Sequence, residues 1–485
     1  MSQARPWFRK EVFFLGGLTA SAVLLYSVVN LARHARFETY MYDLGQVDQV
    51  LWKASRLYVP YSTVTKLPPL VWSRHLDLTF YFQVPFYWLW SDVRMYLILE
   101  PLVFALGVFP VYFFTRKKLG QPLALVISFS YLFSLGAQLA LGYPGHMDIR
   151  LATFLSFLFY FLFTGNEKMV YLFAFLSLLT KENAAVYLTL IGAVTVFSLK
   201  KKKLGSILIV SSVLFLVLVS GYLFSPQCAF WDWYTHLGRG PGEVFGSLLS
   251  RPIGALRLLI FPAEKVKTVF WLLFSFGLLP LLSPELLLVS LPMFAERFLS
   301  NRPDLWILDL HYDVLTVPVF IWATIRGLER LKIGKNKQLA MFAFGGFFVC
   351  LLAATVFHKT PLTKLFDSQF FQPPSYLQAT RKMISQIPGH ATLEAQEDLF
   401  PHLSHRDYIY ALGEGGAVEY IALDVNLFAA QRGGKDKYLV KLINDPNYGL
   451  IFCEEGAILF GRGKKDKAGL CPEVGEFIEI FAGQE

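Results

Sequence analysis

The chain has 485 residues, of which 54% are hydrophobic, 16% are aromatic and only 17% are charged. Apolar stretches without a single charged residue, such as 204–224 and 340–357, recur along it. A soluble domain of this size needs charged residues every few turns, so the composition excludes a soluble protein. It predicts an α-helical polytopic membrane protein.

The net charge of +9 carries information about topology. The tail from His358 is net acidic, so the basic excess belongs to the apolar part of the chain. Because no basic and aromatic patch occurs in a soluble segment, we interpret this charge as contact with anionic membrane lipid and expect no nucleic-acid partner.

A membrane-spanning helix needs about 20 apolar residues, and this length predicts about eleven spans. They are residues 12–31, 95–115, 121–141, 150–164, 168–180, 183–199, 204–224, 267–282, 285–297, 308–325 and 338–357. Lys and Arg clusters mark cytoplasmic loops, and those at 5–10, 116–118, 200–203 and 326–337 then share one side. We therefore predict a multi-pass protein of the cytoplasmic membrane with its N-terminus inside and its tail outside.

Two domains follow from this topology. Residues 1–357 form the predicted transmembrane domain, which includes a long first outer loop at 32–94 and a second outer loop at 225–265. Residues 358–485 form the predicted extracytoplasmic domain, because their composition becomes that of a small soluble α/β protein.

The first outer loop contains two segments with membrane-surface character. Leu44, Val47 and Leu51 recur at helical spacing, which predicts an amphipathic helix lying in the membrane interface. Residues 76–90 are apolar and aromatic but too short for an ordinary span, and Pro85 lies among them. Such lengths are typical of re-entrant or interfacial segments.

The tail alternates short apolar runs with turn residues, a pattern that predicts strands. We expect helices at 377–387 and 437–443 and strands at 392–393, 407–410, 419–424, 449–453 and 457–460. Cys453 and Cys471 lie in this domain and either form a disulfide or remain two reduced thiols. The sequence leaves both alternatives open.

Ionisable groups near the bilayer are costly and mark function. Asp43 and Asp48 are two such groups in the first outer loop, five residues apart. One interpretation is a solvated interfacial helix. The other is that Asp43 accepts a proton from an acceptor hydroxyl or amine, since a carboxylate near an apolar wall gains basicity.

Two histidines lie near further outer segments. His75 opens the stretch 76–90, where an imidazole could contact a phosphate or simply anchor the chain at the interface. His146 and Asp148 lie in the turn Gly142–Arg150, framed by Gly and Pro. They could touch a phosphate or a metal, although their spacing alone is a weak metal signature.

Lys181 and Glu182 split an otherwise continuous apolar run. They either form a plain outer loop or, functionally, Lys181 pairs with a lipid-linked phosphate while Glu182 orients it or binds a cation. His311 precedes another span on the same side and could join them. No nucleophile elbow, P-loop or Rossmann glycine pattern occurs, which argues against hydrolases, nucleotide-driven enzymes and redox enzymes.

Six short motifs follow one another along the chain: Asp-Leu-Gly-x-x-Asp-Gln-x-x-Trp at 43–52, His75, Gly-His-x-Asp at 145–148, Lys-Glu-Asn at 181–183, His-Tyr at 311–312 and Phe-Pro-His-Leu-Ser-His-Arg-Asp-Tyr at 400–408. The order of these motifs resembles that in an uncharacterised family of predicted bacterial and archaeal membrane proteins, a domain of unknown function allied to the GT-C glycosyltransferases. The likeness covers nearly the whole chain.

The resemblance implies a GT-C-like fold and an enzyme that moves a sugar from a polyprenyl-phosphate donor to an acceptor on the outer face of the membrane. It implies that Asp43 is a base or orients the acceptor and that His146 and Asp148 flank the reacting centre. We predict catalytic roles for Asp43, for Asp48 of the same acidic motif, and for Asp148. Lys181 would stabilise the leaving phosphate, because a fixed cation stabilises developing negative charge, and an inverting displacement needs a base on the opposite face.

Two points stay open at this stage. Asp43 and Asp48 are not the adjacent acidic pair of many GT-C members, so no metal requirement carries over and a divalent cation is only an option. The alternatives to a transferase are a protein that binds or transports a phosphorylated lipid without chemistry, and a non-catalytic membrane scaffold whose tail docks a partner.

Overall fold

The computed structural model describes residues 6–64, 75–223, 229–333, 337–427, 435–464, 469 and 471–476. The chain divides into two compact units. Unit 1 comprises Met1–Val29, Arg74–Thr79 and Leu97–Phe366, and unit 2 comprises Asn30–Ser73, Phe80–Tyr96 and Asp367–Glu485.

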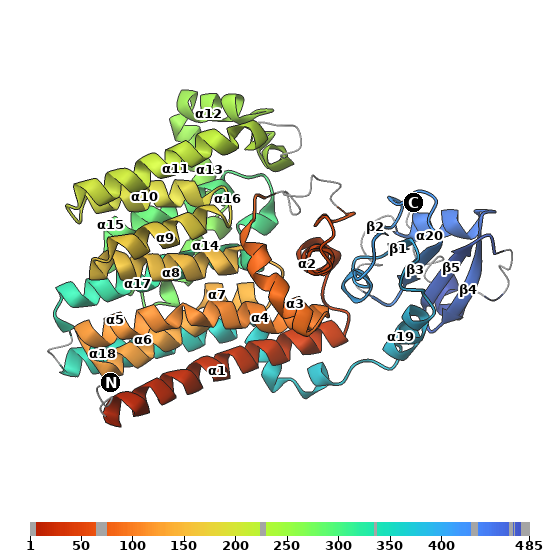
Figure 1. Cartoon of the computed structure of the whole chain (residues 1–485), viewed down its shortest axis with the longest axis horizontal. Helices are drawn as coiled ribbons and strands as arrows, with labels where there is room; N and C mark the ends of the chain where they lie inside the picture. The colour runs from red at the N-terminus through yellow and green to blue at the C-terminus, as the bar shows by residue number, and fades with distance from the viewer. Residues whose placement is uncertain are drawn as a thin grey trace. The chain divides into compact units, whose positions relative to one another are not determined.

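Unit 1 is helical. Helices α1 (Pro6–Ala35) and α4 (Val93–Leu106) run through its boundary with unit 2. The others are α5 (Val108–Leu119), α6 (Gln121–Phe133), α7 (Leu135–Leu141), α8 (Asp148–Thr164), α9 (Glu167–Leu178), α10 (Ala184–Phe197), α11 (Lys202–Leu223), α12 (Pro241–Ser250), α13 (Pro252–Ile260), α14 (Glu264–Phe274), α15 (Pro284–Leu287), α16 (Leu291–Phe298), α17 (Thr316–Arg330) and α18 (Lys337–Phe357). Figure 1 shows the long helices α5, α6, α8, α9, α10 and α11 side by side, and α8 packs on both α9 and α17.

Glycines let α10 and α11 approach closely. A Cβ atom on Gly192 would lie 2.8 Å from the carbonyl oxygen of Gly205, and one on Gly205 would lie 2.6 Å from that of Gly192. Small residues at such a crossing let apolar helices gain packing contacts where lipid removes the hydrophobic driving force. This pairing is typical of a membrane bundle.

Within the described residues, three helical segments are long and apolar enough to cross a membrane: Glu11–Ala35, Val93–Leu119 and Lys202–Gly221. A fourth span results if α6 and α7, which meet at a bend of 41°, are counted together. The predicted number of about eleven spans stays a prediction, although most predicted spans coincide with a helix.

Three predicted spans differ from the structure. Of these, 308–325 is α-helical only from Thr316, where α17 begins. Residues 267–282 hold α14 and a separate 3₁₀ turn, and 285–297 are divided among α15, another 3₁₀ turn and α16. Pro280, Pro284 and Pro292 lie in this region, and proline interrupts the helical hydrogen-bond ladder. The segments 267–282 and 285–297 are therefore broken helices.

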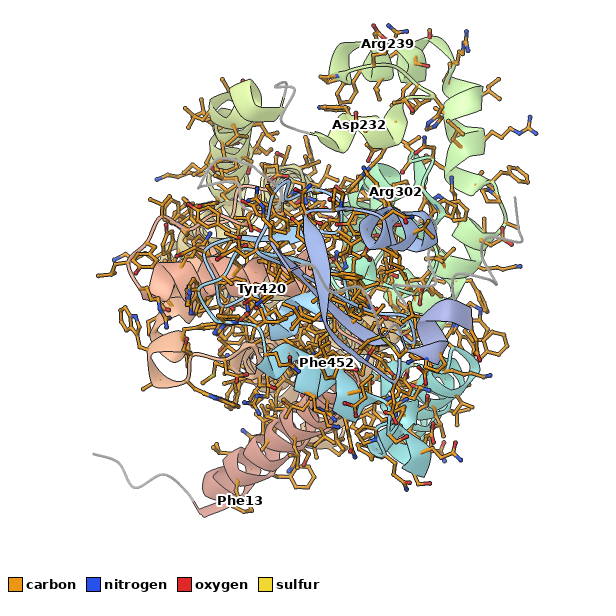
Figure 2. The ribbon with its side chains drawn as sticks, turned by 90° about the vertical axis from the view of Figure 1, so that its right-hand side faces the viewer. Phe13, Asp232, Arg239, Arg302, Tyr420 and Phe452 are labelled. Carbon is orange, nitrogen blue, oxygen red and sulfur yellow. A yellow bond between two sulfur atoms is a disulfide. The ribbon has the colours of Figure 1, made fainter. Side chains whose placement is uncertain are left out.

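Apolar side chains point outward from helices of unit 1. Phe13, which is 83% exposed, stands out from α1 (Figure 2). On α11, Val217 and Leu218 are also exposed. A large exposed apolar surface suits a protein embedded in lipid.

Unit 2 contains a five-stranded sheet that confirms the predicted C-terminal α/β domain. Its strands are β1 (Leu393–Ala395), β2 (Ile409–Ala411), β3 (Tyr420–Asp424), β4 (Tyr448–Glu454) and β5 (Ala457–Arg462), with helices α19 (Leu377–Ser385) and α20 (Lys435–Ile443). The strand order is β2-β1-β3-β5-β4. Strand β1 pairs parallel with β2 and β3, whereas β5 runs antiparallel to β3 and β4.

The sheet has a core on each face because strand side chains alternate. Ile421 and Leu423 share a core with Leu439 of α20, while Ala422 shares the other with Leu377 of α19. Tyr420 and Phe452, labelled on the sheet in Figure 2, pack against the α19 core.

Residues of the first outer loop contribute to the α19 core. Phe37, Met41 and Val64 are buried in it together with Phe400. Most of the predicted first outer loop therefore folds with the tail, and the predicted boundary at residue 358 does not coincide with the division between the units. This packing joins segments more than 300 residues apart in the chain, and no local pattern reveals it.

The first outer loop forms a turn, Met41–Gly45, followed by α2 (Gln46–Ser55). Every residue of α2 except its last is buried. The predicted amphipathic helix, with one face exposed at the membrane interface, is therefore a helix buried within the protein. The polar side of α2 is covered by α3 (Val84–Leu89) and by tail residues near 404–407. Within 76–90 the structure has only a 3₁₀ turn (Thr79–Gln83) and α3, each too short to cross a bilayer.

The structure settles the open question about the tail cysteines. Cys453 of β4 and Cys471 form a disulfide, with their Cα atoms 5.6 Å apart. This separation lies in the usual range for a disulfide.

Candidate functional site

Six of the eight candidate residues lie in unit 1 and come from four separate segments. His75 precedes the 3₁₀ turn at Thr79, and His146 and Asp148 lie at the turn from α7 into α8. Lys181 and Glu182 form the turn between α9 and α10. His311 begins the short 3₁₀ turn His311–Asp313 before α17. We call these six residues the polar cluster.

A buried ion pair joins two of its segments. The Lys181 Nζ atom lies 3.1 Å from Asp148 Oδ1 and 3.3 Å from Oδ2, and both side chains are almost fully buried. Burial alone would lower the pKa of Lys181, but the carboxylates of Asp148, Glu296 and Glu182 outweigh it and raise that pKa. The ammonium therefore stays charged at neutral pH.

Glu182 holds the segment that carries His75. Its Oε1 atom lies 2.5 Å from His75 Nδ1, and its Oε2 atom accepts a hydrogen bond of 3.1 Å from the Leu76 amide. Burial would raise the pKa of Glu182, but His75 and Lys181 outweigh it and lower that pKa. The ionised carboxylate thus links the α9–α10 turn to the first outer loop.

The two remaining histidines stack on each other beside Asp148. The rings of His146 and His311 are nearly parallel, with centroids 3.1 Å apart, and His311 Nε2 lies 3.7 Å from Asp148 Oδ2. Burial, and then the positive charge of Lys181, lower the pKa of His146 well below its ordinary value, so it is neutral. Within the described part of the chain, the Nδ1 atom of His311 has no hydrogen-bond partner.

Residues that the sequence did not single out support this cluster. The Glu100 carboxylate accepts hydrogen bonds from the amides of Gly145, at 3.1 Å, and His146, at 2.8 Å. Gly145 has a φ of 119°, which favours glycine. Glu100 therefore fixes the turn that presents His146.

A second buried ion pair brings α8 to the first outer loop. Arg150 binds the Asp77 carboxylate, and its Nε atom donates to the Thr79 hydroxyl at 3.0 Å. Arg150 lies two residues after Asp148, and Asp77 lies two residues after His75. This ion pair therefore places His75 and Asp148 in one region.

Glu296 of α16 extends the polar region. It accepts from Asn183 Nδ2 at 3.1 and 3.2 Å and from the Tyr187 hydroxyl at 2.7 Å. The next residue, Arg297, binds Asp313, which ends the turn that begins with His311. The sequence could have pointed to Glu296 and Arg297, because this charged pair ends an apolar run, where charges are costly.

The cluster offers both donors and acceptors to a ligand. The Lys181 ammonium has three N–H donors, and the Asp148 carboxylate accepts hydrogen bonds from some of them. Carboxylates outnumber ammonium groups, since Asp148, Glu182 and Glu296 surround Lys181. Such a mixture suits a ligand that carries sugar hydroxyls as well as one anionic group. Among the described residues, no three His, Cys, Asp or Glu side chains are arranged to hold a metal ion.

Asp43 lies in unit 2 and has an unusual backbone. Its φ is 71° and its ψ is −86°, close to the γ-turn with positive φ, which is rare and strained. The side chain is half-buried. Strained backbone of this kind clusters at functional sites, because the surrounding structure must hold it.

Asp48, also in unit 2, has a buried carboxylate with partners from two other segments of the chain. Its carboxylate is 0% exposed and accepts hydrogen bonds from the Tyr87 hydroxyl, at 2.7 Å, and from the Ser404 hydroxyl. The Nε2 atom of His405 lies 3.1 Å from Asp48 Oδ2. The predicted catalytic role of Asp48 stays a prediction, and this geometry favours a role in holding α2, α3 and the tail together.

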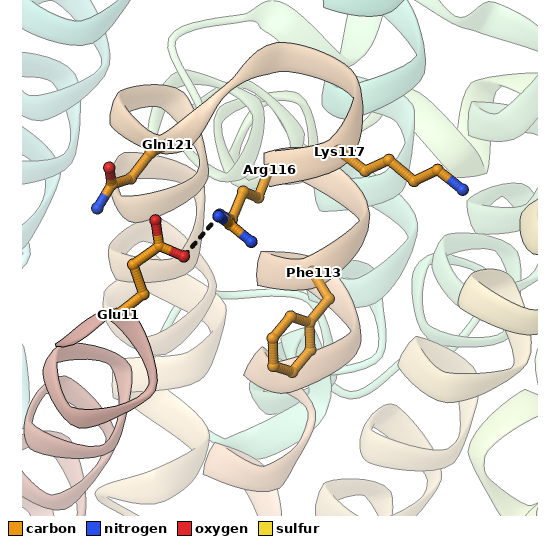
Figure 3. Close-up of a pocket in the computed structure, with 5 residues that line it drawn as sticks. All are labelled: Glu11, Phe113, Arg116, Lys117 and Gln121. Carbon is orange, nitrogen blue, oxygen red and sulfur yellow. Dashed lines mark ion pairs between the residues drawn. The ribbon is translucent and has the colours of Figure 1, made fainter. Parts of the chain in front are cut away.

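A hollow of about 550 Å³ lies elsewhere in unit 1, at the start of α1 and the α5–α6 turn. Figure 3 shows Glu11 and Arg116 facing each other in it, with an ion-pair distance of 2.7 Å. No member of the polar cluster lines it. It lies among the basic residues predicted to face the cytoplasm, so it is separate from the candidate site.

The sequence matches the family described as predicted membrane protein (DUF2079) over residues 33–459. The chain belongs to this family. The family expected from the motifs is thereby confirmed, and the match includes all eight candidate residues. Comparison with curated proteins gives no match for this DUF2079 protein.

Solved structures show which fold the DUF2079 protein has. ArnT from Cupriavidus metallidurans bound to undecaprenyl phosphate aligns with a TM-score of 0.53 and 13% identity, over 92% of this chain and 97% of ArnT. Apo ArnT from the same organism aligns with a TM-score of 0.51 and 14% identity, over 96% of this chain and 100% of ArnT. The DUF2079 protein thus has an ArnT-like fold.

Proposed function

We propose that this DUF2079 protein is an inverting membrane glycosyltransferase of GT-C type. It transfers a sugar from a polyprenyl-phosphate donor to an acceptor on the outer face of the cytoplasmic membrane. The observation that carries the proposal is the polar cluster, in which residues from four segments converge among apolar helices of an ArnT-like fold.

Lys181 is the proposed phosphate ligand. When the bond between sugar and phosphate breaks, negative charge grows on the leaving phosphate, and a buried ammonium stabilises it strongly. Asp148 already holds Lys181 in place, so the ammonium needs no reorganisation during the reaction. His311, with its Nδ1 atom without a hydrogen-bond partner in the described residues, is the second proposed contact.

The other members of the cluster orient the sugar. The carboxylates Asp148 and Glu182 accept hydrogen bonds, as sugar hydroxyls require. His75 is held by Glu182, and His146 packs flat on His311. A divalent cation bound by Glu182 remains part of the proposal, and transfer measured with and without EDTA tests it.

Asp43 is the proposed base. It would take the proton from the acceptor hydroxyl or amine as that atom attacks the sugar carbon and the bond to the phosphate breaks. Its strained backbone supports a functional role. The resemblance to GT-C proteins supplies the assignment of the base itself.

The test uses the full-length protein in lipid nanodiscs with a labelled polyprenyl-phosphate sugar. We expect transfer by the wild type, a loss of about 10²- to 10³-fold in kcat for Lys181→Ala, and a loss of about 10²- to 10⁴-fold for Asp43→Asn with donor binding retained. Lys267→Ala, on the exposed side of α14, is the matched control and keeps full activity.

Inorganic phosphate and sugar-free polyprenyl phosphate serve as competing ligands. The sugar-linked donor should bind most tightly, because the cluster combines one ammonium with several acceptors. Full activity in both Asp43→Asn and Lys181→Ala would refute the assigned roles. Flux of the intact lipid across proteoliposomes without a covalent product would instead favour a lipid transporter, and no binding of any of these ligands would favour a scaffold.

A further inference from the structure

Two segments that are far apart in the sequence run alongside each other within unit 2. The Met41 amide donates to the Glu397 carbonyl at 2.9 Å, and at the other end Lys53 Nζ donates to the Asp407 carbonyl at 3.0 Å. Between them, Gln49 Nε2 donates to the Arg406 carbonyl at 3.2 Å. Residues 41–53 and 397–407 are therefore in contact along their length and in the same direction.

The two segments also approach closely beside Asp43. A Cβ atom on Gly45 would lie 2.6 Å from Cδ1 of Phe400, so only glycine fits here without displacing the ring. Phe400 is fully buried and shares the α19 core with Phe37 and Met41. The aromatic ring thus packs directly against the turn that contains Asp43.

Asp48 links the same two segments with polar bonds. A buried carboxylate is costly unless donors surround it, and here two of its three partners, Ser404 and His405, come from the tail. Trp52 stacks on His405 with ring centroids 5.8 Å apart. Because such a network tolerates little displacement, it fixes the position of α2 against the tail.

Asp43 lies between these attachments. The Met41 contact precedes it, and the Gly45 and Asp48 contacts follow it. A strained γ-turn persists only where neighbouring contacts over-determine the backbone. The attachments on both sides therefore explain how the chain holds Asp43 at its positive φ.

We propose that residues 397–407 are a clamp through which the tail domain positions Asp43. The clamp includes Phe400, Ser404 and His405, which belong to the motif at 400–408. These are positioning residues, since they act through the Asp43 turn and α2. The proposal rests on the proposed function in one respect, namely that Asp43 is the base.

The first measurement is hydrogen exchange of the full-length protein in nanodiscs, which needs no substrate. Removing a hydrogen bond to a charged group in Ser404→Ala should speed exchange of amides 41–53 about tenfold or more. Ser404→Thr keeps the hydroxyl and should restore slow exchange. The matched control is Lys382→Ala, which breaks an exposed ion pair with Glu454 in the same unit.

The expected pattern is local. Amides 41–53 exchange faster in Ser404→Ala and His405→Gln, whereas strands β3 and β5 and the Lys382→Ala protein remain as in the wild type. Unchanged exchange of amides 41–53 in both clamp variants would overturn the proposal. Equal acceleration in the Lys382→Ala control would also overturn it, since the effect would then be general loosening of unit 2.

The second measurement separates positioning from a purely structural role. In the transfer assay, Ser404→Ala should lower kcat about tenfold or more while leaving the KM for the donor unchanged, and Ser404→Thr should recover kcat. An unchanged kcat despite faster exchange would overturn positioning of the base. A wild type without any transfer would refute the proposed function, while the exchange data would still decide whether the clamp exists.

Discussion

At the residue scale, the central feature of this DUF2079 protein is the buried pair of Lys181 and Asp148. Each charge is costly to bury alone, and each offsets most of the cost of the other. The His311 ring also lies near the Asp148 carboxylate, with Nε2 3.7 Å from Oδ2. Removal of the ammonium should therefore lower the stability of the fold in addition to weakening the proposed donor binding.

The stability effect can be separated from the functional effect. Lys181→Ala should lower the free energy of unfolding by about 3–5 kcal/mol, because it leaves Asp148 charged and buried. The double variant Lys181→Ala/Asp148→Asn should regain most of this stability without regaining activity. Thermal unfolding in detergent measures both, and equal stability of wild type and Lys181→Ala would contradict the prediction.

His405 is a residue of unit 2 whose charge is expected to change with pH near neutrality. Burial would lower the pKa of His405, but the Asp48 carboxylate outweighs burial and raises that pKa. Asp92 raises it further by a smaller amount, and Arg56 lowers it slightly. A histidine whose pKa is higher in the folded than in the unfolded protein stabilises the fold while its ring is protonated. This stabilisation is complete at a pH below the unfolded-state pKa of about 6.5, and it is lost as the pH rises through the folded-state pKa.

We therefore expect unit 2 to become less stable as the pH rises above about 6.5. His405→Gln should remove this dependence, because glutamine does not titrate. Exchange of amides in α2 at several pH values, in wild type and variant, measures the effect. The same pH dependence in both proteins would show that another group is responsible.

At the element scale, short turns position the site and the long helices support them. The turn His311–Asp313 is held by Arg297 on one side and by α7 on the other. On α7, a Cβ atom at Gly136 would lie 2.8 Å from the Asp313 carbonyl oxygen. Because backbone cannot move aside as a flexible side chain does, this contact requires glycine.

Gly136→Ala should therefore displace the turn that carries His311. We expect a loss of about 1–3 kcal/mol in the free energy of unfolding, as in other overpacked sites, together with weaker donor binding. Gly246→Ala is the control, since Gly246 lies inside α12 with open space around it. Identical behaviour of the two variants would show that α7 does not set the position of His311.

At the scale of the whole molecule, the main question is which side of the membrane the tail occupies. The distribution of Lys and Arg predicts that it lies outside. The disulfide between Cys453 and Cys471 agrees with this prediction, because disulfides persist in oxidising compartments. It closes a loop with a sequence separation of 18 residues.

In cells, Cys453 and Cys471 should resist thiol labelling until a reductant is added. Loss of the disulfide in Cys453→Ser should lower the stability of unit 2 by about 2–4 kcal/mol, because the open chain gains entropy when unfolded. Cys350→Ala, which changes the free cysteine of α18, is the control. Free labelling of both tail cysteines without reductant would contradict an external tail.

Much of this architecture could be predicted from local sequence. Uncharged apolar runs predicted helices such as α10 and α11, because such runs satisfy their backbone hydrogen bonds internally in lipid. Short apolar runs separated by turn residues in the tail predicted all five strands, with ends shifted by only a few residues. Charges interrupting apolar runs identified Lys181 and Glu182, which the structure brings into the polar cluster.

The contacts made by these residues were decided by tertiary structure alone. The sequence did not single out Glu100 or Glu296, and for Asp48 it left open a catalytic role or a solvated helix. Only the folded structure shows the hydrogen-bond partners of these three carboxylates. The hydrogen bonds of a helix, and the side-chain periodicities of helices and strands, involve residues only a few positions apart, which a sequence displays directly. The pairing of 41–53 with 397–407 depends on side-chain packing between segments hundreds of residues apart, and no local periodicity encodes it.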